Sequence, residues 1–206
     1  MRRLFQPGIN LIRQNFSAYV IINVSFYGLV VLGAVYAFLD PRAQQELTKS
    51  ILQSFSSGPM SVAKDAYVSG NVAAAALITF LVNTFLGSVL ALTAPSLVIP
   101  FAGTIIGLLR ALLWGVALAP SSPELARAMV PHSLVLVLEG QGYIIAMVGV
   151  HVLWTSAFDG VRRGLRGFAS GYLAGFRRNL DICALVAAVL AVSAVYEAFE
   201  VIYLVR

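Results

Sequence analysis

Five long apolar blocks dominate this chain of 206 residues. Each block is long enough to cross a bilayer as a helix, which takes about 20 apolar residues. Hydrophobic residues make up 59% of the chain and charged residues only 11%, whereas soluble domains carry about 25% charged residues. We therefore predict an all-α fold, a polytopic membrane helix bundle that forms one membrane domain over residues 1–206. The expected spans lie near residues 17–39, 67–94, 97–118, 130–157 and 182–205.

Prolines and polar residues separate these blocks. Asp40-Pro41 ends the first block, Pro95 and Pro100 bracket the junction of the second and third, and Pro120 begins the next turn. Residues 40–66 carry apolar side chains at helical spacing within a polar segment, which indicates a short amphipathic helix on the outer surface. A simple connector is the other interpretation of this segment.

The basic residues indicate the topology of the bundle. They concentrate at the N-terminus and after the fourth block, whereas the other two loops are nearly balanced in charge. Because basic residues favour the cytoplasmic side, we expect the N-terminus in the cytoplasm and, after five spans, the C-terminus outside. The formal net charge of +5 is therefore attributed to topology and not to nucleic-acid binding. We interpret the first block as a retained span, since no small-residue cleavage site follows it.

Charged side chains inside apolar blocks are the candidate functional residues, because ionisable groups are costly in a membrane. His132 and Glu139 are seven residues apart, which places them on one helix face about 10 Å apart along the axis. Arg110, Glu139 and Glu197 each lie about 12 Å below the outer surface by helical rise. We therefore predict an ion pair between Arg110 and Glu139, with Glu197 close enough to share the guanidinium. Glu200 is expected to reach the nearby surface.

This intramembrane polar cluster of Arg110, His132, Glu139 and Glu197 has three interpretations. It can lock helices together, serve as a proton or ion relay, or receive the helix of a partner. A metal site is not predicted, because His132 and His151 are about 28 Å apart along one helix. The chain also lacks the nucleotide-binding, zinc-protease and nucleophile-elbow motifs, so we predict no cofactor and no enzymatic activity.

Residues 158–180 combine an apolar stripe with glycines and arginines. Small residues at this spacing let another helix approach closely, and arginines suit a surface of anionic head groups. We predict an amphipathic cytoplasmic helix that lies against the bundle or the inner leaflet, or that contacts a second copy or a cytoplasmic subunit. A plain basic loop is the other interpretation. The expected contact residues are Arg162, Arg163, Arg166, Gly160, Gly164, Gly167, Gly171 and Gly175.

Four short motifs resemble the stage II sporulation protein M family. They are Asn83-Thr84-Phe85-Leu86-Gly87, Ala102-Gly103-Thr104-Ile105-Ile106-Gly107, Pro131-His132-Ser133 and Val195-Tyr196-Glu197-Ala198-Phe199. The resemblance implies a five-span protein of the bacterial inner membrane. It also implies a scaffold that holds partner proteins in an envelope complex, not an enzyme.

Two functions are consistent with these observations. The first is a non-catalytic integral membrane scaffold or complex subunit, whose partners are the lipid bilayer, other membrane-protein subunits or a second copy, and anionic lipid at the arginine-rich segment. The second is a small transporter or channel subunit that uses the buried polar cluster as an ion or substrate path. A path needs polar groups distributed across the bilayer, whereas Arg110, Glu139 and Glu197 are expected at one depth.

Overall fold

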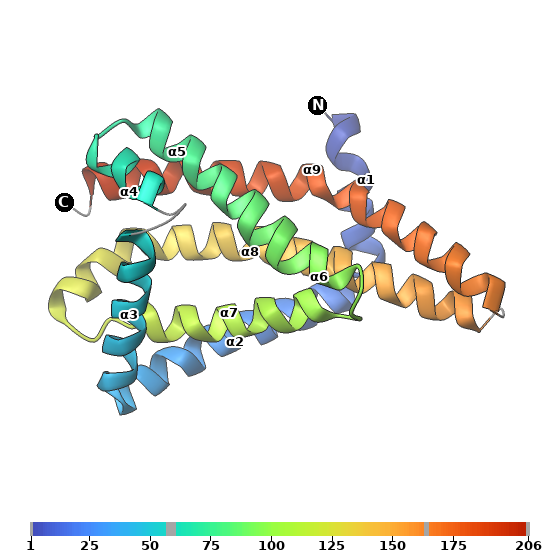
Figure 1. The fold of residues 1–206 in the computed structure, drawn as a ribbon, viewed down its shortest axis with the longest axis horizontal. Coiled ribbons are helices and arrows are strands. Elements are labelled where there is room, and N and C mark those ends of the chain that lie inside the picture. The colour runs from blue at the N-terminus through green and yellow to red at the C-terminus, as the bar shows by residue number, and fades with distance from the viewer. Residues whose placement is uncertain (1, 57–60, 163–164, 205–206) are drawn as a thin grey trace.

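The computed structural model describes residues 2–56, 61–162 and 165–204 of the chain. Within these residues every regular element is a helix, which confirms the all-α prediction. Four of the described helical segments are long and apolar enough to cross a membrane. Figure 1 shows that the long helices run roughly side by side, and that two shorter ones lie across one end of the bundle. The protein is therefore a helical membrane bundle.

The N-terminal part forms two helices, α1 (Arg2–Gln14) and α2 (Phe16–Leu39). α1 packs against the last helix of the chain, where Gly8 meets the backbone near Asp181. α2 matches the first predicted span and ends at Asp40, as the Asp-Pro pair indicated. α2 crosses α7 (Ala102–Ala117) at Gly33 and Gly115, where an added Cβ on either residue would collide with the facing backbone. The two glycines thus allow backbone-to-backbone packing of two spans.

The segment after α2 contains α3 (Pro41–Ser56) and α4 (Ser61–Val68). The predicted amphipathic helix is therefore present as α3, which runs across the ends of α2 and α7 (Figure 1). Gln44 attaches α3 to α7, because its buried amide Nε2 donates to the Ala119 carbonyl at 2.8 Å and to the Ala117 carbonyl at 3.3 Å. Ala117 is the last residue of α7, where helix carbonyls lack an intrahelical donor, and the Ala119 carbonyl also accepts from the Ser121 N–H at 2.8 Å.

The second span is one continuous apolar segment of three helical types. It comprises α5 (Val72–Leu81), the π-helix η2 (Val82–Thr93) and the single turn α6 (Ala94–Ser96). It begins five residues later than predicted because Asn71 caps α5 by accepting from the Ala74 N–H. π-Helical turns are uncommon and frequently mark functional segments.

The third predicted span, 97–118, is shorter than expected. Residues 97–101 form the turn that follows α6, and Phe101 adopts a left-handed conformation with φ of 58° before α7 begins. α7 has 16 residues, so it is about 24 Å long and falls short of the 30 Å hydrocarbon core. It is apolar but shorter than the four segments that are long enough to cross a membrane.

The last two helices form a long antiparallel hairpin. α8 (Pro123–Val161) and α9 (Leu165–Tyr203) have 39 residues each, which corresponds to about 58 Å. They make the most extensive helix contact in the structure. They contain the predicted spans 130–157 and 182–205 and extend beyond both.

Within residues 158–180, the described residues 158–161 and 165–180 are helical but do not form the separate amphipathic helix that we predicted. Residues 158–161 end α8, and residues 165–180 are the first part of α9, which continues without a break into the last span. The glycines explain this arrangement. An added Cβ on Gly171 would collide with the Ser156 carbonyl, and one on Gly175 would lie 2.6 Å from the Leu153 carbonyl. The small-residue stripe is thus occupied by α8 of the same chain.

The connections fall at two ends of the bundle (Figure 1). The C-terminal end of α8, the N-terminal end of α9 and the α6–α7 turn lie toward one end, which we call the hairpin end. The helix α3, the α7–α8 loop and the C-terminal part of α9 lie at the other, which we call the α3 end. Successive long helices therefore run in opposite directions between the two ends.

Candidate functional site: a polar cavity inside the bundle

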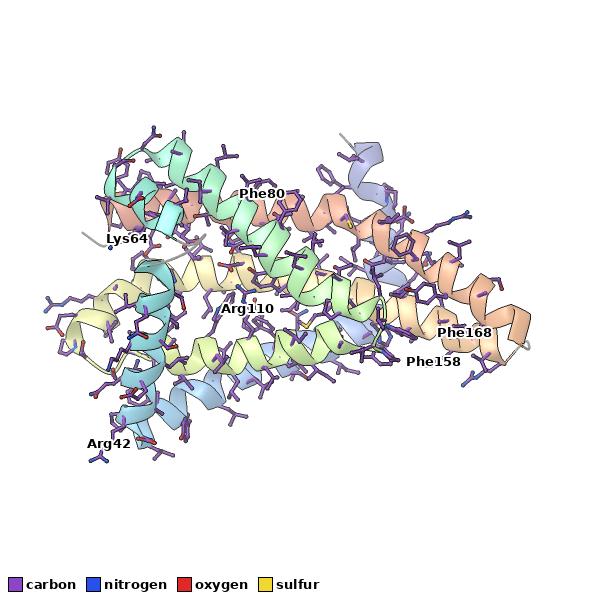
Figure 2. The ribbon with its side chains drawn as sticks, in the orientation of Figure 1. Arg42, Lys64, Phe80, Arg110, Phe158 and Phe168 are labelled. Carbon is purple, nitrogen blue, oxygen red and sulfur yellow. The ribbon has the colours of Figure 1, made fainter. Side chains whose placement is uncertain are left out.

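A cavity of about 400 Å³ lies between α7, α8, α9 and η2, toward the α3 end. Four predicted residues line it: Arg110 on α7, His132 and Glu139 on α8, and Glu197 on α9. Figure 2 shows Arg110 inside the bundle, whereas Arg42 and Lys64 lie at its periphery. The structure therefore brings His132 together with Arg110, Glu139 and Glu197, the three residues that the sequence placed at one depth.

Asn83 and a set of apolar side chains complete the cavity. Asn83, at the start of η2, is buried and lies beside Glu139. Ile51 reaches the cavity from α3, so the amphipathic helix covers one side of it. The other apolar lining residues are Val82, Trp114, Ala117, Leu118, Val135 and Leu136.

Arg110 contacts aromatic rings in place of the expected carboxylate. Its guanidinium carbon lies 4.3 Å from the ring centroid of Tyr143 and 5.3 Å from that of Trp114. A guanidinium over an aromatic face is stabilised by the ring quadrupole, more strongly where water is excluded. Among the described residues, Arg110 forms no ion pair and none of its N–H groups donates a hydrogen bond. The predicted Arg110–Glu139 ion pair is therefore not formed, although the two charges are close enough to interact.

Glu139 is held by a neighbour on its own helix. It is 8% exposed, and its Oε1 accepts a hydrogen bond of 2.8 Å from the hydroxyl of Tyr143, one turn further along α8. Tyr143 thus joins both charged groups, since its ring faces Arg110 and its hydroxyl faces Glu139. The sequence reasoning missed Tyr143, although its spacing of four residues from Glu139 would have indicated the contact.

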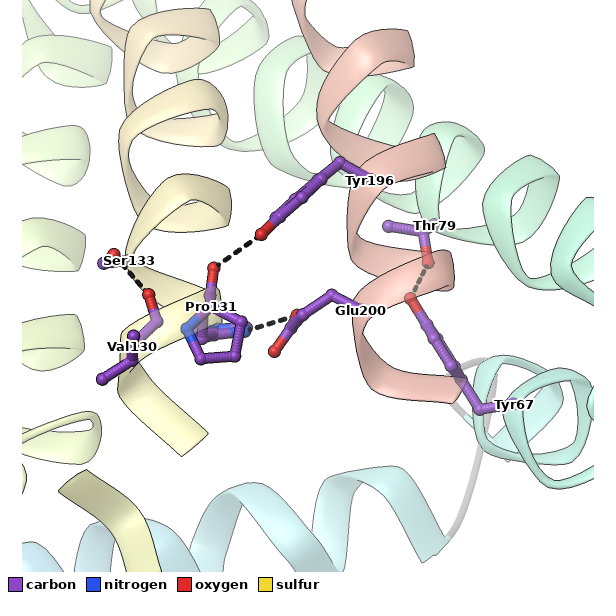
Figure 3. Close-up of polar contacts among 8 residues, drawn as sticks. Tyr67, Thr79, Val130, Pro131, Ser133, Tyr196 and Glu200 are labelled. Carbon is purple, nitrogen blue, oxygen red and sulfur yellow. Dashed lines mark hydrogen bonds and ion pairs between the residues drawn. The ribbon is translucent and has the colours of Figure 1, made fainter. Parts of the chain in front are cut away.

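His132 is paired with Glu200, which the sequence analysis had placed at the surface. Its Nδ1 lies 3.1 Å from Glu200 Oε2, and the Glu200 side chain is only 1% exposed (Figure 3). The expectation that Glu200 reaches the surface is wrong because α4 and α5 cover this end of α9. In this cover, Ala66 of α4 and Ala75 and Ala76 of α5 pack against Ala198 and Ile202 of α9.

Two more hydrogen bonds lie near the pair, one between α9 and α8 and the other between α4 and α5 (Figure 3). The Tyr196 hydroxyl donates to the Pro131 carbonyl at 3.1 Å, and the Tyr67 hydroxyl lies 2.8 Å from Thr79 Oγ1. Tyr67 also lies close to Glu197. One carboxylate oxygen on each of Glu197 and Glu200 is nevertheless buried without a hydrogen-bond partner among the described residues.

The cavity is closed toward the hairpin end by a tightly packed layer. Tyr143, Ile144 and Met147 of α8 and Leu92 of η2 have no exposed surface. Across from them, an added Cβ on Gly107 would lie 2.5 Å from the Met147 sulfur. The polar cavity therefore occupies one half of the bundle only.

The predicted contact residues of the arginine and glycine segment lie far from this cavity. Gly160, Gly167, Gly171 and Gly175 lie on the α8–α9 seam. Arg162 is exposed and forms an ion pair of 3.6 Å with Asp159, also exposed. Arg163 and Gly164 lie outside the described residues, and of Arg166 only the helical backbone is described.

His151 does not join the cluster. It lies on α8 at the depth of the α6–α7 turn, with its ring 6.2 Å from that of Phe101. Within the described part of the chain, no group of three His, Cys, Asp or Glu side chains is positioned to hold a metal ion.

The fold and the cavity together define a polytopic helical membrane protein with a buried polar site in one half of its bundle. Comparison of the chain with protein-family models, curated proteins and solved structures gave no match.

Proposed function

We propose that this protein is a non-catalytic integral membrane scaffold or subunit of a bacterial envelope complex. The observation that carries the proposal is the α8–α9 hairpin, whose two helices of about 58 Å exceed the thickness of a bilayer core. A rigid two-helix arm that leaves the membrane offers a surface on which a partner can be held. The resemblance to the stage II sporulation protein M family supports the same role.

An aromatic group marks where this arm leaves the membrane. Trp154 Nε1 donates to the Ser96 carbonyl at 2.6 Å, and the Tyr172 hydroxyl donates to the Leu97 carbonyl at 2.7 Å. Trp and Tyr are enriched at membrane interfaces. Phe158 and Phe168 lie further out along the hairpin (Figure 2). We call residues 158–162 and 165–172 the arm.

The arm is held rigidly by backbone contact and carries exposed charge. Its glycines bring the α8 and α9 backbones together at Gly160 and Gly171. Arg162 is 84% exposed, and Arg177 and Arg178 are exposed at its base. These arginines suit anionic lipid head groups or an acidic partner surface. By the positive-inside rule, the arm lies in the cytoplasm of a bacterial inner membrane and the C-terminus lies outside.

The alternative function is a small transporter or channel subunit, and the polar cavity is the observation that favours it. A conducting path would have to continue past Tyr143, Met147 and Leu92, which form a closed layer in this conformation. We therefore rank the scaffold role first.

The test is gentle detergent extraction from the native host, followed by identification of co-purifying proteins. Arg162→Ala with Arg177→Ala removes two exposed charges near the arm, and Arg42→Ala with Lys49→Ala removes two from α3 as a control. We expect a defined set of companions that is lost with the arm variant and kept with the control. A monomer without companions that supports ion flux in liposomes would contradict the scaffold role and favour transport.

A further inference from the structure

The polar cavity contains one cationic and one anionic group whose binding capacity is unused. Arg110 has five N–H donors, and none of them is engaged in the described structure. Glu197 lines the same cavity and has a buried oxygen, Oε2, without a donor. Buried polar groups are normally hydrogen-bonded, so Glu197 Oε2 offers an acceptor to a donor group of a ligand in this cavity, beside the half-buried Arg110.

The aromatic contacts of Arg110 do not satisfy its N–H donors. Tyr143 and Trp114 interact with the guanidinium through their ring faces. They stabilise its charge and fix its position, but they accept none of its hydrogen bonds. The guanidinium is therefore held in place while its donors stay available, which suits the recognition of a carboxylate or a phosphate.

The carboxylates provide the complementary half of the site. Glu139 and Glu197 come from different helices and lie close enough for their charges to interact. Asn83 adds an amide beside Glu139. Carboxylate oxygens accept hydrogen bonds from an ammonium group, which has three donors and no acceptor.

The volume and the lining set the size of the ligand. A cavity of about 400 Å³ is in the range of small-molecule sites, which combine mostly apolar walls with a few polar groups that orient the ligand. Apolar walls here include Val82, Val135 and Leu136. A small molecule with an acidic group and an ammonium group carries no net charge, so it satisfies both halves without adding charge to the membrane interior.

We propose that this cavity binds a small zwitterion, with its acidic group on Arg110 and its primary ammonium between Glu139 and Glu197. This chemistry is shared by free amino acids and by the phosphoethanolamine head group of a lipid. The proposal does not rest on the scaffold role, because the arm and the cavity lie in different parts of the molecule.

Trp114 provides a direct signal for binding. The chain has two tryptophans, Trp114 and Trp154, and Trp114 lines the cavity. In a Trp154→Phe background, Trp114 fluorescence is followed while glycerophosphoethanolamine, a phosphodiester without net charge, or β-alanine is added to the purified protein. We expect a saturable change, and none from methylamine and acetate supplied together at the same concentrations.

Variants link this signal to the proposed groups. Arg110→Gln and Glu197→Gln are each expected to weaken binding at least about tenfold, since each removes a charged hydrogen-bond partner. Arg110→Lys keeps the positive charge but loses the planar set of guanidinium N–H donors. It replaces Arg110→Gln if that variant does not fold. Arg162→Gln and Asp159→Asn, both on the arm, are the matched controls.

A lipid experiment distinguishes a free zwitterionic solute from a lipid head group as the ligand. The protein is placed in phosphatidylglycerol nanodiscs that contain either phosphatidylethanolamine or phosphatidylcholine, and retained lipid is measured by native mass spectrometry. Retention of phosphatidylethanolamine alone indicates the head group, because phosphatidylcholine lacks ammonium N–H donors. A response to soluble zwitterions alone indicates a free solute. No response to either, an equal response to acetate alone, or undiminished binding in the Arg110 and Glu197 variants would overturn the proposal.

Discussion

His132 on α8 and Glu200 on α9 are 68 residues apart in the chain, yet His132 Nδ1 lies 3.1 Å from Glu200 Oε2. The Glu200 side chain is 1% exposed, and that of His132 is 25% exposed. The contact therefore joins the two longest helices where α4 and α5 cover the α3 end of the bundle.

We expect His132 and Glu200 to be energetically coupled. In a double-mutant cycle, His132→Leu and Glu200→Leu should together cost less than the sum of the single changes, by about 1 kcal/mol, as for other polar contacts between membrane helices. The measurement is the free energy of unfolding in mixed detergent. Additive effects would show that the contact contributes nothing to stability.

The contribution of Arg110 to the stability of the bundle should depend on the aromatic ring of Tyr143. Tyr143→Leu removes the cation–π contact and should destabilise the bundle in a way coupled to Arg110→Leu by about 0.5–2 kcal/mol. Tyr143→Phe is the matched control, since it keeps the ring and loses only the hydrogen bond to Glu139. A coupling of equal size to both Tyr143 variants would exclude the ring as the main partner.

Helical rise explains why the depth of the polar cluster could be predicted and its pairing could not. Counting residues from the turns placed Arg110, Glu139 and Glu197 at one level, and all three line the same cavity. Pairing also depends on the rotation of each helix about its axis, which residue counting does not supply. Tyr143 therefore took the place that the sequence analysis had assigned to Glu139 as the neighbour of Arg110.

Packing against other helices accounts for the other differences between the sequence predictions and the structure. Glu200 was expected at the surface because it lies near the end of an apolar block, but the α4–α5 segment packs over that end. The glycines of residues 158–180 correctly indicated close helix packing, yet a spacing rule does not name the partner. The partner is α8, and the segment became part of a long hairpin.

A large residue on the α8–α9 seam should weaken the hairpin. Gly171→Leu would drive a side chain into the Ser156 carbonyl, and we expect it to lower the free energy of unfolding by about 1–3 kcal/mol. Gly28→Leu on α2 is the matched control because no atom lies within 4 Å of an added Cβ there. We expect the control to change stability by no more than about 0.5 kcal/mol. Thermal unfolding in detergent measures both, and equal losses would show that the seam is not close-packed.

The attachment of α3 to α7 should depend on one amide. Gln44→Ala removes the side-chain donor of the Ala117 carbonyl, whereas the Ala119 carbonyl still accepts from the Ser121 N–H. Unsatisfied buried acceptors cost about 1–3 kcal/mol. Hydrogen exchange of the α3 backbone should therefore speed up, because α3 would detach more often from the bundle. The neighbouring Gln45 is exposed, so Gln45→Ala should leave exchange unchanged. Unaltered protection in Gln44→Ala would mean that apolar contacts alone hold α3.

The orientation of the bundle decides which side of the membrane faces the cavity. Cys183 is the single cysteine of the chain, so Cys183→Ala provides a background for labelling. In that background, Ser121→Cys in the α7–α8 loop should react with a membrane-impermeant maleimide in intact cells, whereas Ser170→Cys on the arm should react only after permeabilisation. Both serines are exposed in the structure, so burial in the protein should not prevent either new thiol from reacting. The Cys183→Ala protein without a new cysteine should stay unlabelled.

The reverse pattern would place the arm outside and the cavity toward the cytoplasm, against the positive-inside rule. The expected pattern would place the zwitterion site in the outer half of the membrane, where ligands from outside the cell or from the outer leaflet reach it first.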